Sequence, residues 1–521
     1  MPAEISGGTI QSRALDYCQD LLDIVDFHGA ERDHIKFTGY TDPFLPTRYP
    51  VTEVFSAVFG ALGTVANRIG YLKNGRVQEI SVNTDHASMA IMSHILPSVN
   101  GVSIPEYVQK LAETYGSNHK TPCENPLTGL FRTKDNRWVH FLASFDPHPT
   151  LKILGVDGSK LTDAISARDV IEEKTLQWNS FELEDALAAA GACGCAVRTT
   201  EEFLATEQGK EIHKHLPIEV QKICDAPKLH LPPGKRILEG VKVLELCRVI
   251  AGPTTTRTLA EYGAQVLKVS SPYLRDVDVL AVDGNSGKRS CFLDLKSEEG
   301  KKQLTELVKD CDVFVQGYRH RSMEHLGFTF DDVKRIKGSN GFVYLTVNCY
   351  GNAGPWIDRP GWEQLAQAVT GMATVQGGSP NTPCLLPMTL SDYLTGYAGA
   401  LGVIAALLKR AEEGGSYLVQ TSLVQLDLYV ISKGLYSAAV GKKLMALYPP
   451  FHYYEGTHIH CLHLLQQLQK DRPYLFNGIF EVTPGPLGEV KHMKPVVQMP
   501  ETPLYFSSPT RNFGVDKAEW V

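Results

Sequence analysis

The cysteine pattern lacks the paired spacings that hold metal ions or disulfide frameworks. Eleven cysteines are scattered along the chain, and no two of them form a CxxC pair. Disulfide scaffolds are usually short chains with an even number of cysteines, whereas this chain is long and the number is odd. The sequence therefore predicts free thiols and a reducing compartment.

Long hydrophobic runs and a surplus of positive charge are also missing. The longest apolar stretch, Leu394 to Leu408, is too short and too rich in Gly and Ala for a membrane span. The net charge of −7 offers no basic field for DNA or RNA. Met1 to Arg13 do not resemble a secretory signal, and Glu519 to Val521 are not a peroxisomal address. We therefore expect a cytoplasmic protein without nucleic-acid or membrane partners.

What is present is an alternation of strand-like and helix-like segments after the Pro/Gly turn at Leu231 to Lys235. An alternating apolar run, Val241 to Leu246, predicts a strand, and a helix at Thr254 to Tyr262 and a strand at Ala264 to Val269 follow. This order indicates an α/β fold with a parallel sheet covered by helices on both faces, within a chain of about two to four domains. The later expected elements are a helix at Lys301 to Lys309 and strands at Phe292 to Leu295, Val313 to Val315 and Val343 to Val347.

Two distant segments of the chain are similar to each other. Val54 to Met92 and Tyr393 to Ile431 both contain Gly-Ala-Leu-Gly, which begins at Gly60 and at Gly399. In each segment a Gly/Ala-rich helix, a charged turn with Gly, a β-branched strand and an apolar helix follow one another. The sequence thus predicts an internal repeat. A chance likeness between two amphipathic helices is the alternative.

After Val241, short motifs follow one another in a particular order. They are Arg248-Val249-Ile250-Ala251-Gly252-Pro253, Leu259 to Ala264, Gly287 to Ser290, Leu293 to Lys296, His325 to Phe328, Tyr350 to Pro355 and Arg359-Pro360-Gly361. This series, from about Gly240 to Tyr429, resembles the family III CoA-transferases, a group that includes formyl-CoA and carnitine CoA-transferases and has acyl-CoA racemases as relatives. The resemblance implies an open parallel sheet with flanking helices, a Rossmann-like large domain and a smaller α+β domain.

The first part of the chain resembles the later part of the same family domain. Phe131 to His140 is similar to the hairpin that opens the family's small domain, and Ala188 to Arg198 is similar to the segment that returns to the large domain. We therefore expect a partly duplicated or rearranged version of the family fold. Its expected divisions are a truncated half at 1–235 with a small domain at about 98–185, a large domain at 236–445, and a C-terminal hairpin and closing segment at 446–521.

Asp392 immediately precedes the helix predicted to end at about Lys409. A carboxylate there meets the free N–H groups of the first helical turn and the positive end of the helix dipole. The resemblance implies that Asp392 is the nucleophile that attacks the thioester carbonyl and later carries CoA as an aspartyl thioester. Position alone favours a helix N-cap for Asp392, and the two roles are compatible.

Two glutamates accompany this candidate. The resemblance places Glu363 beside the same site, where it orients the acceptor or moves a proton. The alternative for Glu363 is a solvated residue in the first turn of a helix. Glu53 faces Asp392 across the repeat, and we expect it to be a surface residue at a helix start rather than a second, degenerate centre.

The loop Val249-Ile250-Ala251 follows the first strand of the predicted sheet. Ligands of open α/β sheets collect at the carboxyl ends of the strands. The resemblance implies that this loop binds CoA, with a purely structural turn as the alternative.

Four further residues are candidates for CoA binding through the resemblance. Arg289 and Lys296 are candidates for the CoA phosphates, and Tyr318 and Arg319 match an aromatic–Arg pair of the family. Each is otherwise a surface residue. The CoA thioester is a substrate here, so we expect no permanently bound cofactor. The expected partners are an acyl-CoA and a small carboxylic acid. Family members usually form interlocked dimers, but a partly duplicated chain could supply both halves itself, so a homodimer and a monomer are both open.

The chain departs from the family pattern at three places. Ser270-Ser271-Pro272 replaces a charged pair, His325 replaces an Arg, and a Gly-rich loop has no clear counterpart before Phe131. These departures leave a non-catalytic CoA-binding or scaffold protein as one alternative. An acyl-CoA racemase or isomerase is another, although Trp362 stands where the racemases use a His base and cannot exchange a proton.

A histidine-rich run near the C-terminus does not predict a metal site. Its residues are His458, His460, Cys461 and His463. We expect a strand here, and a strand would divide these side chains between its two faces.

Overall fold

The computed structural model describes residues 3–5, 7–107, 127–143, 145–161, 164–232, 234–274 and 276–521. Pro233 of the predicted Pro/Gly turn lies outside the described residues, as does most of the stretch before Phe131, where the family's Gly-rich loop has no clear counterpart in the sequence.

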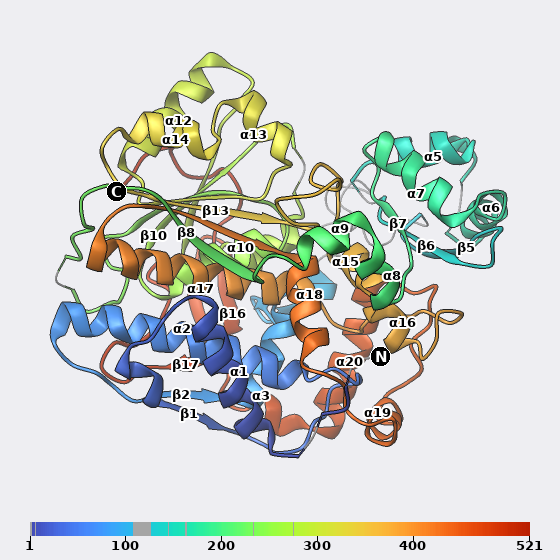
Figure 1. The fold of residues 1–521 in the computed structure, drawn as a ribbon, viewed down its shortest axis with the longest axis horizontal. Helices are drawn as coiled ribbons and strands as arrows, with labels where there is room; N and C mark the ends of the chain where they lie inside the picture. The colour runs from blue at the N-terminus through green and yellow to red at the C-terminus, as the bar shows by residue number, and fades with distance from the viewer. Residues whose placement is uncertain are drawn as a thin grey trace.

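The centre of the molecule is a seven-stranded sheet in the order β11-β10-β9-β12-β13-β14-β8 (Figure 1). All neighbouring strands are parallel except β8, which runs antiparallel to β14 at the edge. The strand order reverses between β9 and β12, and such a switch point leaves a crevice at the carboxyl ends of the strands. The expected α/β fold with a parallel sheet is confirmed. The strands are β8 (Ile218–Cys224), β9 (Lys242–Leu246), β10 (Gln265–Ser270), β11 (Lys288–Phe292), β12 (Val313–Gln316), β13 (Val343–Asn348) and β14 (Ser416–Ser422).

Helices cover both faces of this sheet, and alternate residues of each strand contribute to the two cores. Leu244 and Leu246 of β9 pack with one set of helices, whereas Val243 packs with the other. Helices α12 (Glu298–Asp310), α13 (His320–Leu326) and α14 (Phe330–Lys337) lie on the first face. On the second face lie α10 (Ala251–Glu261), α15 (Glu363–Thr370), α16 (Met372–Gln376), α17 (Leu390–Glu413) and α18 (Leu423–Ser432). The short helix α11 (Ala281–Gly284) packs in a separate small cluster through Val282.

The two segments of the predicted repeat adopt the same order of elements. Helix α2 (Val51–Asn74), β2 (Ile80–Asn83) and α3 (Thr84–Met89) correspond to α17, β14 and α18, and α2 packs beside α17 (Figure 1). Strand β2 lies between a parallel neighbour, β1 (Ile35–Thr38), and an antiparallel one, β17 (Val497–Gln498), just as β14 lies between β13 and β8. A common origin of the two segments stays a prediction.

Matching glycines allow the close approach of helix and strand in both copies. A Cβ at Gly63 would lie 2.8 Å from Val497 and 2.9 Å from Ile80, and a Cβ at Gly402 would lie 2.6 Å from Val419 and 2.9 Å from Ile218. Any larger residue would force the helix away from its strands. The Gly-Ala-Leu-Gly motif is therefore explained by packing.

The C-terminal part of the chain pairs with strands of the N-terminal half. The hairpin β15 (Phe480–Gly485) and β16 (Gly488–Met493) pairs with β3 (Ser98–Val99), which pairs with β4 (Val102–Ser103). The expected boundaries at 235 and 446 do not follow the sheets, because β8 belongs to the large sheet and β16 and β17 join the N-terminal half. The sequence of a linker does not indicate that segments on its two sides pair as strands.

The remaining helices of these regions are α1 (Ile10–Ile24), α8 (Thr200–Ala205), α9 (Glu207–Ile212), α19 (Ala438–Met445) and α20 (Thr457–Asp471).

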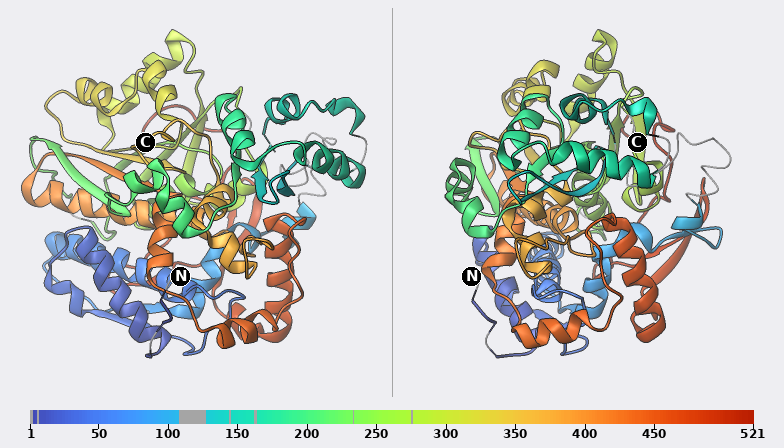
Figure 2. Two further views of the ribbon diagram at one scale, coloured as in Figure 1. Left: turned by 45° about the vertical axis from the view of Figure 1, so that its right-hand side comes forward. Right: turned by 90° about the vertical axis from the view of Figure 1, so that its right-hand side faces the viewer.

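A small unit stands to one side of the large sheet (Figure 2). Its antiparallel sheet is β5 (Gly129–Arg132), β6 (Trp138–Phe141) and β7 (Gly194–Ala196). The predicted hairpin at Phe131 to His140 is the β5–β6 pair, and the third strand lies beyond the expected end at about residue 185. Its helices are α5 (His148–Leu154), α6 (Ala164–Thr175) and α7 (Ser180–Ala189).

Three local expectations are corrected. The predicted strand at Phe292 to Leu295 is β11, which begins earlier at Lys288, a buried lysine that interrupts the apolar pattern. The His-rich run is helical within α20, because Cys461, Leu464, Leu465 and Leu468 are spaced as one buried helical face. Helix α17 is long and apolar enough to cross a membrane, but its apolar window is wholly buried in the core.

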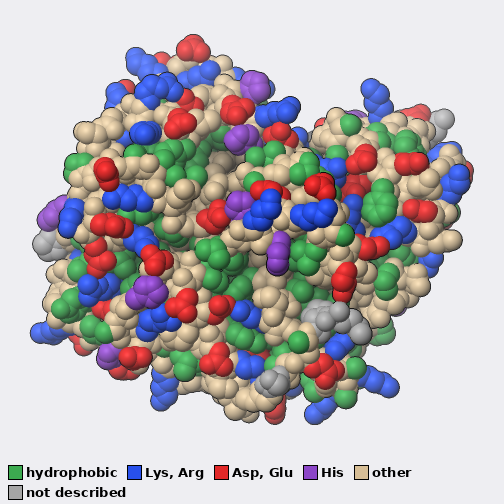
Figure 3. All heavy atoms as spheres, viewed as in Figure 1, with side chains coloured by type: hydrophobic (Ala, Val, Ile, Leu, Met, Phe, Trp, Pro, Cys, Tyr) green, Lys and Arg blue, Asp and Glu red, His purple; other side chains and the backbone are tan. Residues whose placement is uncertain are grey.

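Charged side chains of both signs are interspersed over the face shown in Figure 3. This arrangement agrees with the absence of a basic field in the composition.

Candidate active site

Two cavities adjoin at the carboxyl ends of the sheet strands. They have volumes of about 320 Å³ and about 280 Å³, and Leu142, Phe145 and Trp362 line both. The rings of Phe145 and Trp362 are stacked, with centroids 5.2 Å apart. This aromatic pair, one ring from the small unit and one from the N-cap of α15, forms the wall between the cavities.

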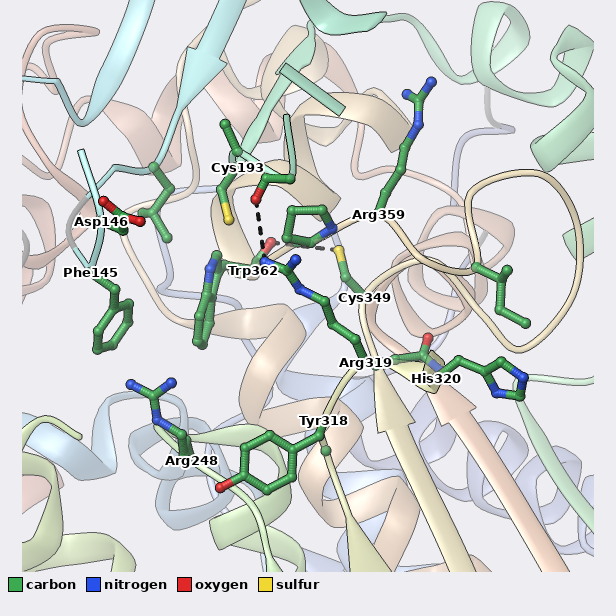
Figure 4. Close-up of a pocket in the computed structure, with 18 of the residues that line it drawn as sticks. Phe145, Asp146, Cys193, Arg248, Tyr318, Arg319, His320, Cys349, Arg359 and Trp362 are labelled. Carbon is green, nitrogen blue, oxygen red and sulfur yellow. Dashed lines mark hydrogen bonds between the residues drawn. The ribbon is translucent and has the colours of Figure 1, made fainter. Parts of the chain in front are cut away.

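The first cavity is polar and is built by strand ends (Figure 4). Arg248 follows β9, and Tyr318 and Arg319 follow β12. The Arg248 guanidinium lies 4.7 Å over the Phe145 ring, and an Arg319 Nη2–H donates to the Gly191 carbonyl at 3.3 Å. Arg359 completes the basic lining. Guanidinium groups on a polar wall suit phosphate and amide groups of a ligand.

The second cavity is mostly apolar. Helix and loop residues from several distant parts of the chain line it, including Val249, Ile250, Val279 and Leu280. The polar side chains in this lining are His94, Thr389, Asp392, Glu363, Gln364, Thr457 and His458. Asp392 is the third residue of α17 and is 6% exposed.

Glu363 caps the helix that carries Asp392. Its carboxylate accepts hydrogen bonds from the backbone N–H groups of Ser391 at 3.0 Å and of Asp392 at 2.6 Å, and from the amide of Gln367. Two free donors of the first turn of α17 are thereby satisfied. The solvated alternative for Glu363 is wrong, because this side chain is 2% exposed.

The N-cap alternative for Asp392 is also wrong. Thr389 occupies the N-cap position, and Asp392 lies inside the first turn. Among the residues that the structure describes, no donor bonds to the Asp392 carboxylate, which faces the apolar cavity.

The electrostatics of this site make ionisation costly. Burial and then the neighbouring Glu363 raise the pKa of Asp392 well above its usual value. Burial also raises the pKa of Glu363, although the two backbone amides oppose this effect. A third buried carboxyl, Asp427 of α18, has its pKa raised by burial and by Glu363. Like charges in a dry site cannot all ionise, so these carboxyls titrate as a coupled group.

The loop expected to bind CoA lies mainly at the second cavity. Val249 and Ile250 line that cavity, whereas Ala251 begins α10 and lines neither. Val249 has a φ of 66°, which is strained for a β-branched residue, and its N–H donates to Asp276 at 3.2 Å. The structure thus places this loop beside Asp392 rather than within the polar cavity.

The four residues expected to contact CoA separate into two pairs. Tyr318 and Arg319 line the first cavity. Arg289 and Lys296 line neither cavity, because Arg289 donates to the Glu519 carbonyl of the C-terminal segment and Lys296 is exposed in the turn after β11. That segment covers the edge strand, and the sequence gives no sign of this contact.

Several lining residues have no assigned role in the sequence analysis. Arg248 stands directly after the first strand, where its position alone could have marked it. Phe145, His94 and His458 come from three separate parts of the chain, so no local pattern identifies them. Burial lowers the pKa values of His94 and His458 to about 4.

Glu53 is not the expected surface residue. Its side chain is fully buried, and its Oε1 accepts from Arg13 at 2.7 Å and from the Tyr436 hydroxyl at 2.6 Å. Glu53 and Asp392 occupy the third position of matching helices, but only Asp392 faces one of the two cavities.

The family model for CoA-transferase family III matches residues 35–227 and 238–451. The chain belongs to CoA-transferase family III. The resemblance seen in the sequence is therefore confirmed, and the family's members use CoA thioesters as substrates. Within the part of the chain that the structure describes, no group of three or more His, Cys, Asp or Glu residues is placed to hold a metal ion.

Individual relatives agree with this assignment. The family III chain is 32% identical to the acetyl-coenzyme A transferase nodX of Hypoxylon pulicicidum, over 93% of this chain and 88% of that protein. It is 29% identical to an acyl-CoA transferase of Gibberella moniliformis, over 82% of this chain and 77% of that protein. A formyl-CoA:oxalate CoA-transferase of Escherichia coli is 30% identical over 36% of this chain and 47% of that protein.

Proposed function

We propose that this protein transfers CoA from an acyl-CoA donor to a carboxylic acid acceptor through a thioester on Asp392. One observation carries the proposal. Asp392 presents a carboxylate without hydrogen-bond donors to an apolar cavity, and that cavity adjoins a polar one lined by three arginines, Arg248, Arg319 and Arg359.

The two cavities match the two ends of an acyl-CoA. The polar cavity suits the amide groups and phosphates of CoA, with Arg319 and Arg248 as their binding residues. The aromatic wall of Phe145 and Trp362 lies where the pantetheine arm enters the second cavity. The thioester then lies beside Asp392.

The reaction consists of four acyl exchanges. An Asp392 oxygen attacks the thioester carbonyl, and the C–S bond breaks. CoA departs as its thiolate, and an aspartyl–acyl anhydride remains. The thiolate attacks the aspartyl carbonyl of the anhydride, which releases the donor carboxylate and forms the aspartyl-CoA thioester. The acceptor carboxylate attacks that thioester and displaces CoA thiolate, which leaves an anhydride between Asp392 and the acceptor. The thiolate finally attacks the acceptor acyl carbonyl, which yields the new acyl-CoA and restores Asp392.

The surroundings of Asp392 favour this chemistry. An ionised carboxylate that accepts no hydrogen bond in an apolar cavity is poorly solvated, so it is a stronger nucleophile than one in water. Exclusion of water also protects the anhydride from hydrolysis. Glu363 holds the first turn of α17, which keeps Asp392 in its orientation toward the cavity.

The cavity is less suited to racemisation. His94 and His458 line it, but pKa values of about 4 make them weak bases at neutral pH. Trp362 stands where the racemases use a His base, and its indole ring cannot exchange a proton with a substrate α-carbon. A measurable exchange of the α-proton of an acyl-CoA in heavy water would favour the racemase alternative.

The test is CoA transfer from acetyl-CoA to a panel of carboxylic acids, with new thioesters identified by mass spectrometry. We expect new thioesters with the natural chain and none with Asp392→Asn. Asp310→Asn, an exposed residue at the end of α12, is the control and should behave as the natural chain does. Transfer by Asp392→Asn at the natural rate would refute the proposal.

A further inference from the structure

A third cavity adjoins the Asp392 cavity on the side away from the polar one. It has a volume of about 510 Å³ and lies between the β3–β4 hairpin and α20. Ile95, Pro105 and Leu462 line both this cavity and the Asp392 cavity. The three cavities thus form a series, with Phe145 and Trp362 at one junction and Leu462 at the other.

One face of α20 lines the third cavity. Leu462 and Leu465 supply its apolar part, and the exposed Gln466 and Gln469 follow them at helical spacing on that face. Leu96, Phe476 and Phe480 extend the apolar lining, which is charged only at Lys491. This third cavity is much larger than a two-carbon acyl group requires.

We infer that the substrates are medium- to long-chain acyl-CoA thioesters, whose hydrocarbon chain passes Leu462 and lies in the third cavity. The inference rests on the proposed function, because it takes Asp392 as the position of the thioester. Along the series the polar cavity comes first, the Asp392 cavity second and the apolar third cavity last. A fatty acyl-CoA has its nucleotide, thioester and hydrocarbon tail in the same order.

The junction at Leu462 determines which chains fit. A short acyl group ends within the Asp392 cavity of about 280 Å³. A longer one must pass between Ile95, Pro105 and Leu462. Each methylene transferred from water into an apolar cavity strengthens binding about fourfold, so the gain should continue as the chain enters the third cavity.

The test measures dissociation constants of S-alkyl-CoA thioethers by calorimetry, with ethyl, hexyl and dodecyl chains. These thioethers lack the thioester carbonyl that Asp392 would attack, so binding is measured whether or not the proposed reaction occurs. For the natural chain we expect affinity to rise from ethyl through dodecyl. Leu462→Trp narrows the junction and should weaken binding of S-dodecyl-CoA at least about tenfold more than binding of S-ethyl-CoA.

Two further variants complete the experiment. Lys470→Trp places the same ring at an exposed position of α20 outside both cavities and should leave all three affinities unchanged. Gln466→Trp fills only the third cavity from a surface position and serves if Leu462→Trp does not fold. The inference is overturned if affinity stops rising beyond the hexyl chain, or if Leu462→Trp and Gln466→Trp weaken all three ligands equally. Failure of the transfer assay alongside this binding pattern would refute the proposed function alone.

Discussion

The Glu363 carboxylate accepts a hydrogen bond from the backbone amide of Asp392 at 2.6 Å. The contact joins α15 to the first turn of α17 and leaves the side chain of Asp392 directed at the cavity. Glu363 therefore accepts hydrogen bonds from free N–H groups at the start of α17, and the Asp392 carboxylate stays available for the reaction. This division explains why two buried carboxyls lie together at a cost in electrostatic energy.

Replacement of Glu363 tests its effect on Asp392. Because the charge of Glu363 raises the pKa of Asp392, Glu363→Gln should lower that pKa and move the acidic limb of the kcat/KM–pH profile to lower pH. The variant should also reduce kcat, since an amide group satisfies the donors of α17 less well. The pH profile of CoA transfer checks both effects. A reduced kcat with an unmoved limb would assign Glu363 a structural role alone.

The buried position of Asp392 predicts a gain in stability on its removal. Its folded-state pKa is raised, so the folded protein loses stability as pH rises from the unfolded pKa toward the folded one. Asn cannot ionise, so Asp392→Asn should be more stable than the natural chain at pH 8 and equal to it near pH 4. Urea unfolding at both pH values checks this. Destabilisation at pH 8 would contradict a raised pKa of Asp392 in the folded protein.

Two basic residues allow the cavity lining to be compared with the surface as the site of CoA binding. Arg319 lines the polar cavity, whereas Lys296 lies in an exposed turn. Arg319→Ala should weaken CoA binding about tenfold, as expected for loss of one charge-assisted hydrogen bond, and Lys296→Ala should leave it unchanged. Calorimetric titration with free CoA makes the comparison. The reverse pattern would place the nucleotide along β11 and not in the polar cavity.

A buried charge cluster in the large sheet predicts a stability effect. Glu245 accepts from Lys268 at 2.9 Å and from Lys288 at 2.8 Å, and all three side chains are buried. Burial works to raise the pKa of Glu245, but Lys268 and Lys288 outweigh it and lower that pKa to about 2. Glu245→Gln removes the counter-ion of Lys288 and leaves Lys268 only Asp276 at 3.8 Å, so it should cost about 3–5 kcal/mol of unfolding free energy.

The matched control for this cluster is an exposed ion pair. Glu306 bonds to Lys309 at the surface of α12, so Glu306→Gln should change the unfolding free energy by less than about 0.5 kcal/mol. Urea unfolding of both variants measures the difference. Similar effects at the two positions would show that the buried cluster does not stabilise the sheet.

The parallel sheet was predictable because its strands are short, almost wholly apolar runs separated by helical periods. Val343 to Asn348 shows this pattern in β13. Strand β11 breaks it, since Lys288 is buried through an ion pair that only the fold provides. The edge strands β8 and β17 pair with segments far away in sequence, and no local property of a strand specifies a distant neighbour.

The site was predictable only in part, for a similar reason. Asp392, Glu363, Tyr318 and Arg319 belong to ordered motifs of one region, so the resemblance located them. His94, Phe145 and His458 reach the cavity from other regions, and Arg289 is covered by the C-terminal segment. Their places depend on packing between parts of the chain.

The covalent step at Asp392 is tested most directly by intact-mass measurement of the protein after brief exposure to an acyl-CoA and rapid quenching. We predict an added mass equal to that of CoA less one water, located by peptide mapping on the segment that contains Asp392 and absent from Asp392→Asn. Turnover with no adduct, or an adduct on any other residue, would contradict it.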